Sequence, residues 1–186
     1  MRPDDEAALI GLDALSVVEW LRQQYALEED ARALHAQLLR LVALRQHHAS
    51  VMPGAEALLS WLESRRIPKL IVSNSEAAVV RTGLERLGWS ERFADVIGVD
   101  DVANPKPHPA PYRLALHRLG LPASACVALE DSAVGASSAF RAGIPVLGIQ
   151  HKLGLKSPML RRCCAALFED LTDAQRWIEQ RLLVAS

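Results

Sequence analysis

The segment CVALEDSAVGASSAFRA, residues 126–142, joins a short apolar run to a polar turn and a stretch of small residues. The run at 126–129 is continuously apolar, which is typical of a strand covered by helices on both faces. The residues from Ala133 to Ala142 predict a helix. A buried strand that leads directly into a helix is the repeating unit of a parallel sheet, so this segment indicates an α/β fold.

The same alternation continues on both sides of this segment, from Gly54 onward. Further strands are predicted from apolar or β-rich runs at 70–72, 96–99 and 146–149, with a weaker one at 166–168. Helices are predicted around 58–62, over 76–87, through 112–119 and at the end of the chain. Strands separated by single helices need right-handed crossovers. We therefore predict a Rossmann-like, doubly wound parallel sheet with helices on both faces.

The first fifty residues show only helical periodicity. Apolar residues recur there at three- and four-residue spacing, which predicts two amphipathic helices: Leu15, Val18 and Leu21, then Leu34, Leu38, Leu41 and Val42. This pattern ends at Met52-Pro53-Gly54, a sequence that commonly interrupts regular structure. We predict a helical unit over residues 1–50 and an α/β unit over residues 51–186.

Composition and charge exclude several classes of protein. The formal net charge of -1 gives no general attraction to nucleic acid or anionic lipid. No apolar run approaches the ~20 residues that span a bilayer, and the first six residues are too acidic to open a secretory signal. We predict a cytoplasmic protein with no nucleic-acid or membrane partner. The sequence does not indicate its oligomeric state.

Polar residues follow three of the predicted strands, where open α/β sheets bind ligands. Ser73 and Asn74 follow the strand at 70–72, and Lys106 lies in a proline-rich loop after the strand at 96–99. Glu130 and Asp131 directly follow the strand at 126–129. We expect these side chains to meet at one edge of the sheet.

Each of these residues also has a purely structural interpretation. Ser73 or Ser75 could cap the following helix, because a serine hydroxyl accepts a hydrogen bond from a first-turn amide. Lys106 could lie in solvent, as most lysines do. Glu130 and Asp131 could stabilise the N-terminus of the next helix. However, two adjacent carboxylates behind an apolar strand repel each other unless a cation lies between them.

The set as a whole indicates a phosphate and metal site. A carboxylate pair suits Mg²⁺, which commonly binds one or two carboxylates together with substrate phosphate and water. A lysine and a hydroxyl directed at the same point would hold phosphoryl oxygens and offset their charge.

These residues, in this order, resemble the haloacid dehalogenase superfamily, closest to its sugar phosphatase and β-phosphoglucomutase-like branch with a helical cap. The likeness runs from about Leu9 to about Ile149 and rests on four stretches: Met52-Pro53-Gly54-Ala55, Ile71-Val72-Ser73-Asn74-Ser75, Lys106-Pro107-His108-Pro109 with Tyr112, and Leu129-Glu130-Asp131-Ser132-Ala133-Val134-Gly135 followed by Ala142-Gly143-Ile144.

The resemblance implies roles for the matching positions. Ser73 and Lys106 would be catalytic and would bind phosphate together with Asn74. Glu130 and Asp131 would bind Mg²⁺. Residues 1–50 would be part of a cap, in which Gly11 and Leu12 would belong to a substrate-specificity loop. An ordinary turn at Gly11 explains that residue equally well.

The family's first motif, an apolar strand that ends in Asp-x-Asp, is absent from residues 1–186. The resemblance implies that its first aspartate attacks phosphorus and its second transfers protons. The missing strand would lie between the strands that end at Ser73 and Glu130. Either these two strands pair with each other, or the chain is unstable, or another segment fills the position.

Three functions remain as alternatives. The leading hypothesis is a Mg²⁺-dependent phosphatase of a small phosphorylated metabolite, for instance a sugar phosphate, whose assigned start lies too late. An in-frame strand with Asp-x-Asp roughly thirty to forty residues upstream would support this hypothesis. The others are a non-catalytic descendant that binds phosphate or a partner, and a β-phosphoglucomutase-like isomerase. For the chain as written we predict no turnover through an aspartyl-phosphate.

Overall fold

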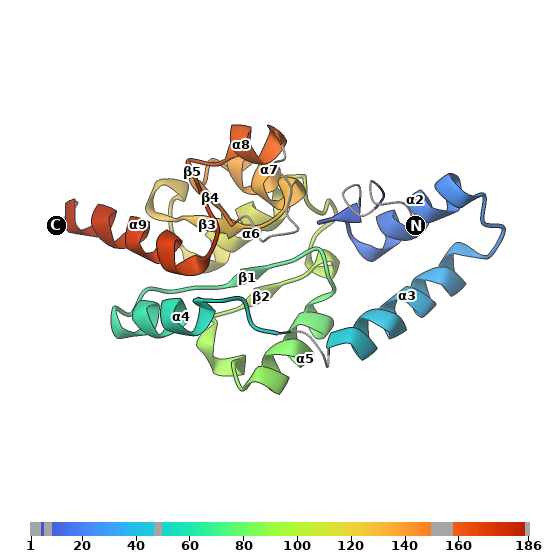
Figure 1. Cartoon of the computed structure of the whole chain (residues 1–186), viewed down its shortest axis with the longest axis horizontal. Coiled ribbons are helices and arrows are strands. Elements are labelled where there is room, and N and C mark those ends of the chain that lie inside the picture. The colour runs from blue at the N-terminus through green and yellow to red at the C-terminus, as the bar shows by residue number, and fades with distance from the viewer. Residues whose placement is uncertain (1–4, 6–8, 47–49, 150–157, 185–186) are drawn as a thin grey trace.

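The computed structural model describes residue 5 and residues 9–46, 50–149 and 158–184 (Figure 1). Two helices come first, α2 (Ala14–Tyr25) and α3 (Ala31–Gln46). Strands and helices then alternate: α4 (Ala55–Ser64), β1 (Ile71–Val72), α5 (Ala77–Leu87), β2 (Val96–Ile97), α6 (Ala110–Leu119), β3 (Ala128–Glu130), α7 (Ala133–Arg141), β4 (Val146–Ile149), α8 (Pro158–Cys163), β5 (Ala166–Phe168) and α9 (Leu171–Val184). Short 3-10 turns lie at η1 (Ser90–Arg92), η2 (Val99–Asp101) and η3 (Ala123–Ala125). The predicted α/β order is confirmed.

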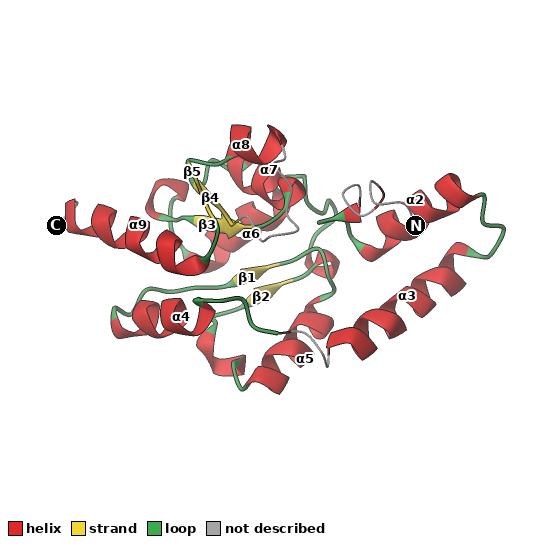
Figure 2. Cartoon of the chain, viewed as in Figure 1, coloured by secondary structure: helices red, strands yellow, loops and turns green. Residues whose placement is uncertain are grey.

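The strands are parallel, as predicted, and they form two separate sheets (Figure 2). β1 pairs with β2, and β4 lies between β3 and β5. Among the described residues, β1 and β3 do not pair with each other. The first of the three expected alternatives, closure of these two strands onto one another, is therefore excluded. Each of these strands keeps one edge outside any described ladder.

Helices cover both faces of the three-stranded sheet. One apolar cluster contains Val146 together with residues of α6, α7 and α8, and the other contains Leu147 and Ile149 with α9. Val146 and Leu147 are successive residues of β4, and successive strand side chains point to opposite faces. Both side chains are buried, at 1% and 0% exposed. The continuous apolar run of β4 is therefore explained by a sheet that is covered on both sides.

Two strand boundaries differ from the prediction. The strand predicted at 126–129 is paired from Ala128 to Glu130, since its partner β4 begins only after Pro145, whose carbonyl accepts the Ala128 amide at 2.9 Å. The run predicted at 96–99 ends as a strand at Ile97. The Gly98 amide donates to the Asp101 carboxylate at 2.8 Å, which turns the chain into η2.

The two N-terminal helices match the predicted periodicity. Asp13 caps α2 by accepting the Ser16 amide at 3.0 Å. The apolar stripe of α3 is exposed at its C-terminal end, where Leu41 is 59% accessible, whereas Leu34 and Leu38 are half-buried. The division into units at residues 1–50 and 51–186 stays a prediction. In the described residues, no helix is long and apolar enough to cross a membrane, and the predicted cytoplasmic location is untested.

Candidate active site

Lys106 connects the two sheets. Its side chain is 7% exposed, and its ammonium donates to the Val72 carbonyl at the end of β1 (2.9 Å) and to Glu130 Oε1 at the end of β3 (2.5 Å). The ammonium also lies over the ring of Tyr112, 5.1 Å from its centroid. The structural interpretation of Lys106 as a solvated loop lysine is therefore wrong. Its charge lies where the carboxyl ends of two parallel strands converge.

Glu130 is buried beside this cation. It is 6% exposed, and its Oε1 atom accepts hydrogen bonds from Lys106 and from the Tyr112 hydroxyl. Burial and the adjacent Glu130 charge raise the pKa of Tyr112 well above its ordinary value, so the phenol keeps its proton and remains a donor. A buried carboxylate is stable only when such partners satisfy it.

Gly135, in the first turn of α7, leaves room for this carboxylate. A Cβ atom at Gly135 would lie 1.9 Å from Glu130 Oε2 and 2.2 Å from Glu130 Cδ. The helix N-terminus is capped by Ser132, whose hydroxyl accepts the Gly135 amide at 3.0 Å. Ser132 therefore supplies the side-chain cap of this helix.

Asp131 differs from its neighbour in exposure. Its side chain is exposed and makes no hydrogen bond or ion pair within the described residues, whereas Glu130 is buried and paired. No group of three or more histidine, cysteine or acidic side chains suited to a metal ion occurs in the described part of the chain. Any divalent cation here would therefore depend on this carboxylate pair and on oxygens of water and ligand.

Ser73 and Asn74 follow β1 as expected. The Ser73 amide donates to the Ile97 carbonyl at 2.9 Å, and its hydroxyl accepts the Ser75 amide at 3.0 Å. The Ser73 hydroxyl thus stabilises a local turn. The N-cap residue of α5, Glu76, makes no side-chain cap. The Asn74 amide instead faces Lys106 and Gly11.

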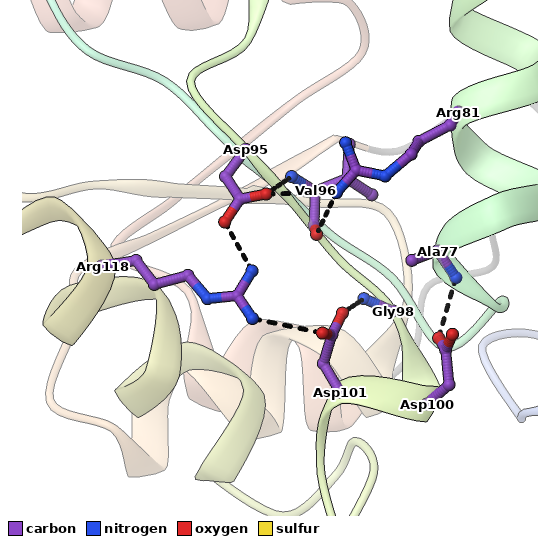
Figure 3. A network of polar contacts seen from close by, with 8 residues as sticks. All are labelled: Ala77, Arg81, Asp95, Val96, Gly98, Asp100, Asp101 and Arg118. Atoms are coloured by element: carbon purple, nitrogen blue, oxygen red, sulfur yellow. Dashed lines mark hydrogen bonds and ion pairs between the residues drawn. The ribbon is translucent and has the colours of Figure 1, made fainter.

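The sequence reasoning missed an acidic and basic network around β2, which Figure 3 shows. Arg118 of α6 donates to Asp95 at 2.5 Å and to Asp101 at 3.1 Å. Arg81 of α5 reaches the same Asp95 carboxylate at 3.3 Å. Burial acts to raise the pKa of Asp95, but the hydrogen bonds from Arg118, the Val96 amide and Arg81 hold it below its ordinary value. This network joins both ends of β2 to the two flanking helices.

Asp100 completes the network at the start of α5. Its carboxylate accepts the Ala77 amide at 2.8 Å, so a residue 23 positions away caps α5, the helix that the structural interpretation had assigned to a serine cap (Figure 3). Gly98 lies between these groups, and a Cβ atom there would come within 2.3 Å of the Ala77 amide nitrogen. The loop that leads from β2 to Lys106 is therefore fixed at its origin. Spacing along the sequence carries no signal for such a long-range cap.

The structure brings together four of the residues singled out in the sequence: Gly11, Asn74, Lys106 and Glu130 are joined by hydrogen bonds. Ser73 and Asp131 are sequence neighbours of this group. Their assigned roles in catalysis, phosphate binding and metal binding stay predictions, as does the specificity role of Gly11 and Leu12.

Comparisons with known proteins agree on the class. A sequence model of haloacid dehalogenase-like hydrolases matches residues 5–143. A phosphoglycolate phosphatase of Rhodospirillum rubrum is 32% identical over 96% of this chain and 78% of its own length. One from Xanthomonas campestris pv. campestris is 34% identical over 66% of this chain, which spans only 56% of that relative's length.

Solved structures share the fold. The β-phosphoglucomutase of Clostridium difficile superposes with a TM-score of 0.80 at 17% identity, covering 100% of this chain and 85% of that one. At such low identity the likeness concerns the arrangement of elements, and the site must be judged from its own residues.

Proposed function

The chain belongs to the haloacid dehalogenase-like hydrolase family, and from this premise we propose that its site binds the phosphoryl group of a small phosphorylated metabolite. The proposed reaction of the complete site is hydrolysis of that phosphoric monoester. Lys106 and Ser73 would hold phosphoryl oxygens, and the Gly11–Leu12 loop would face the rest of the substrate.

The position of Lys106 is the observation that carries this proposal. Lys106 is buried at the converging carboxyl ends of β1 and β3, where its ammonium donates hydrogen bonds to Glu130 and to the Val72 carbonyl that compensate for its burial. Such a fixed cation is what phosphoryl transfer requires, because negative charge builds up on the phosphoryl oxygens. Open α/β sheets bind ligands at this edge.

Glu130 and Asp131 are proposed to bind Mg²⁺. The exposed Asp131 carboxylate has no hydrogen-bond or ion-pair partner in the described residues, and Glu130 Oε2 lies where a Cβ atom of residue 135 would otherwise be. Two carboxylates with phosphate and water oxygens form a ligand set that Mg²⁺ accepts. The bound cation would neutralise phosphoryl charge that Lys106 alone does not balance.

The names of the relatives supply the first substrate to test. Two of them are phosphoglycolate phosphatases, so 2-phosphoglycolate is the first probe, with sugar phosphates as the next class. A mutase acting through the same residues would be recognised by an isomerised phosphosugar in place of free phosphate.

Residues 1–186 alone are proposed to bind phosphate without hydrolysing it. They contain a cation, a hydroxyl and a carboxylate pair but no Asp-x-Asp sequence that could supply a nucleophile and a proton donor. Phosphatase activity of this exact chain that disappears in Asp131→Ala would overturn the proposal. A binding protein descended from the enzymes would show the same lack of turnover, and only added upstream sequence with Asp-x-Asp would separate the two.

Calorimetric titration tests the binding. With Mg²⁺ present, we expect saturable binding of inorganic phosphate and of 2-phosphoglycolate, weakened at least tenfold in Lys106→Met. Lys69→Met is the matched control, since Lys69 precedes β1 at its opposite end and pairs with Glu63 at 3.2 Å. Asp131→Asn, at an exposed position, should remove only the Mg²⁺ dependence. Equal binding by the wild-type chain and Lys106→Met, or no binding by either, would refute the assignment.

A further inference from the structure

The side-chain amide of Asn74 makes three hydrogen bonds to residues that are distant in sequence. Its Oδ1 atom accepts the Lys106 amide at 3.0 Å, and its Nδ2 atom donates to the Lys106 carbonyl at 3.1 Å. The second hydrogen of Nδ2 is directed to the Gly11 carbonyl at 2.8 Å. Both donors of the amide are therefore in use, and none is left for a phosphoryl oxygen.

The first two hydrogen bonds hold the backbone of Lys106 in a segment that has few backbone donors of its own. Lys106 lies between Pro105 and Pro107, neither of which has an amide hydrogen. The Lys106 N–H is thus the one backbone donor in this three-residue segment. Asn74 binds that N–H and the carbonyl of the same residue, so its planar amide fixes the direction in which the lysine side chain leaves the loop.

The third bond ties the N-terminal loop to the same amide. Gly11 has a positive φ of 84°, and a Cβ atom there would lie 2.8 Å from Ser132 Cβ and Oγ and 3.1 Å from Val134 Cβ. The loop therefore packs closely on the segment that follows β3 while it is bonded to the segment that follows β1. Only glycine fits this conformation and this approach.

We propose that Asn74 is a positioning residue that couples the closed position of the Gly11 loop to the orientation of Lys106. The inference deepens the proposed function, because it matters for catalysis only if Lys106 holds the phosphoryl group. When the loop closes, Gly11 restrains the amide from one side, and the amide in turn restrains Lys106. When the loop moves away, the amide loses one of three partners and Lys106 becomes less restrained.

Amide hydrogen exchange measured by NMR tests each half of the coupling. Lys106 N–H reports the lysine side, and Leu12 N–H, which donates to the Leu9 carbonyl at 3.2 Å, reports the loop. We expect Asn74→Ala to speed exchange at both by about five- to tenfold, the effect of one lost neutral hydrogen bond. Ser75→Ala, which changes the exposed hydroxyl of the next residue, is the matched control and should change neither.

Asn74→Asp keeps the shape and the acceptor atom but removes both donors, which covers the case that the alanine variant fails to fold. It should speed exchange at Leu12, and because the acceptor for the Lys106 N–H remains, exchange at Lys106 should speed less than in Asn74→Ala. Unchanged exchange at Leu12 in this variant would overturn the proposed link between Asn74 and the Gly11 loop.

A double-mutant cycle separates coupling from simple structural support. Gly11→Ala displaces the loop without altering Asn74, so it should speed Lys106 exchange when Asn74 is present and add nothing in the Asn74→Ala background. If Gly11→Ala leaves Lys106 exchange unchanged with Asn74 present, the two sites are not coupled and the inference is wrong.

The exchange measurements need no ligand, so they are independent of the proposed function. Adding inorganic phosphate and Mg²⁺ to the wild-type chain tests that function separately. Slower Lys106 exchange with phosphate supports the phosphate site. Coupling without any phosphate effect would leave Asn74 as a positioning residue in a protein whose ligand is of another class.

Discussion

Substitution of Gly135 by alanine tests whether the Glu130 carboxylate is held closely against α7. The new Cβ atom would overlap Glu130, at 1.9 Å from Oε2, 2.2 Å from Cδ and 2.5 Å from Oε1. Glu130 cannot move freely, because Lys106 and the Tyr112 hydroxyl bind its Oε1 atom. Alanine at this position must therefore displace the carboxylate from at least one of its two partners.

The expected cost follows from two opposing effects. Separating a buried ion pair costs about 3–5 kcal/mol, because a charge is left without compensation in the interior. Alanine in place of glycine inside a helix returns about 0.8–1.0 kcal/mol. We expect the free energy of unfolding to fall by about 2–4 kcal/mol, which at ~3 °C per kcal/mol lowers the melting temperature by about 6–12 °C.

Urea unfolding followed by circular dichroism and tryptophan fluorescence measures this loss. Gly83→Ala is the matched control, because Gly83 lies inside α5 and a Cβ atom there would meet nothing within 4 Å. The control should gain up to about 1 kcal/mol from helix propensity alone. If Gly135→Ala is as stable as the wild-type chain, then the carboxylate is not held against α7 as the structure has it, and the argument for a fixed Lys106–Glu130 pair fails.

Three further predictions concern charged groups. Lys106→Met should lower the free energy of unfolding by about 3–5 kcal/mol, because Glu130 is left buried and unpaired. In urea unfolding, adding Glu130→Gln to the same chain should restore most of that loss. An unchanged free energy of unfolding in Lys106→Met alone would contradict this prediction. Arg118→Met should cost about 1 kcal/mol or less and much less in 1 M salt, since Arg118 is partly exposed between two aspartates; a loss that is independent of salt would argue against an ionic role. The Arg92 hydrogen bond lowers the pKa of Glu63 to about 2 from 4.5, so the ionised Glu63 contributes its full stabilisation above pH 4.5 and loses it as the pH falls toward 2. Acid unfolding of Glu63→Gln should lack this pH dependence. Equal curves of stability against pH for the wild-type chain and Glu63→Gln would refute the prediction.

The regular elements could be predicted because their signals are local. Continuous apolar runs predicted strands covered on both faces. β4 confirms this, because its residues belong to two apolar clusters, one on each face of the sheet. Strand boundaries were less accurate where a neighbouring strand decided them. Ala128 begins β3 because Pro145 and β4 begin opposite it, and neither is near it in the sequence.

The sequence by itself determined which polar residues follow the predicted strands and could carry chemistry there. It placed a lysine, a hydroxyl and a carboxylate pair in the order and spacing that indicate a phosphate site, and it showed that Asp-x-Asp is absent from residues 1–186. These conclusions needed only residue types and the rule that ligands bind at the carboxyl edge of a parallel sheet.

Only the tertiary structure decided how these residues are partnered. Lys106 binds Glu130 and the end of β1, Asn74 binds the Lys106 backbone and Gly11, and a distant aspartate caps α5. Each of these contacts joins segments more than twenty residues apart, and their formation depends on the packing of two sheets that share no described strand pair. Periodicity reports which face of an element is buried, whereas the partner of a buried polar group depends on which other element packs against it.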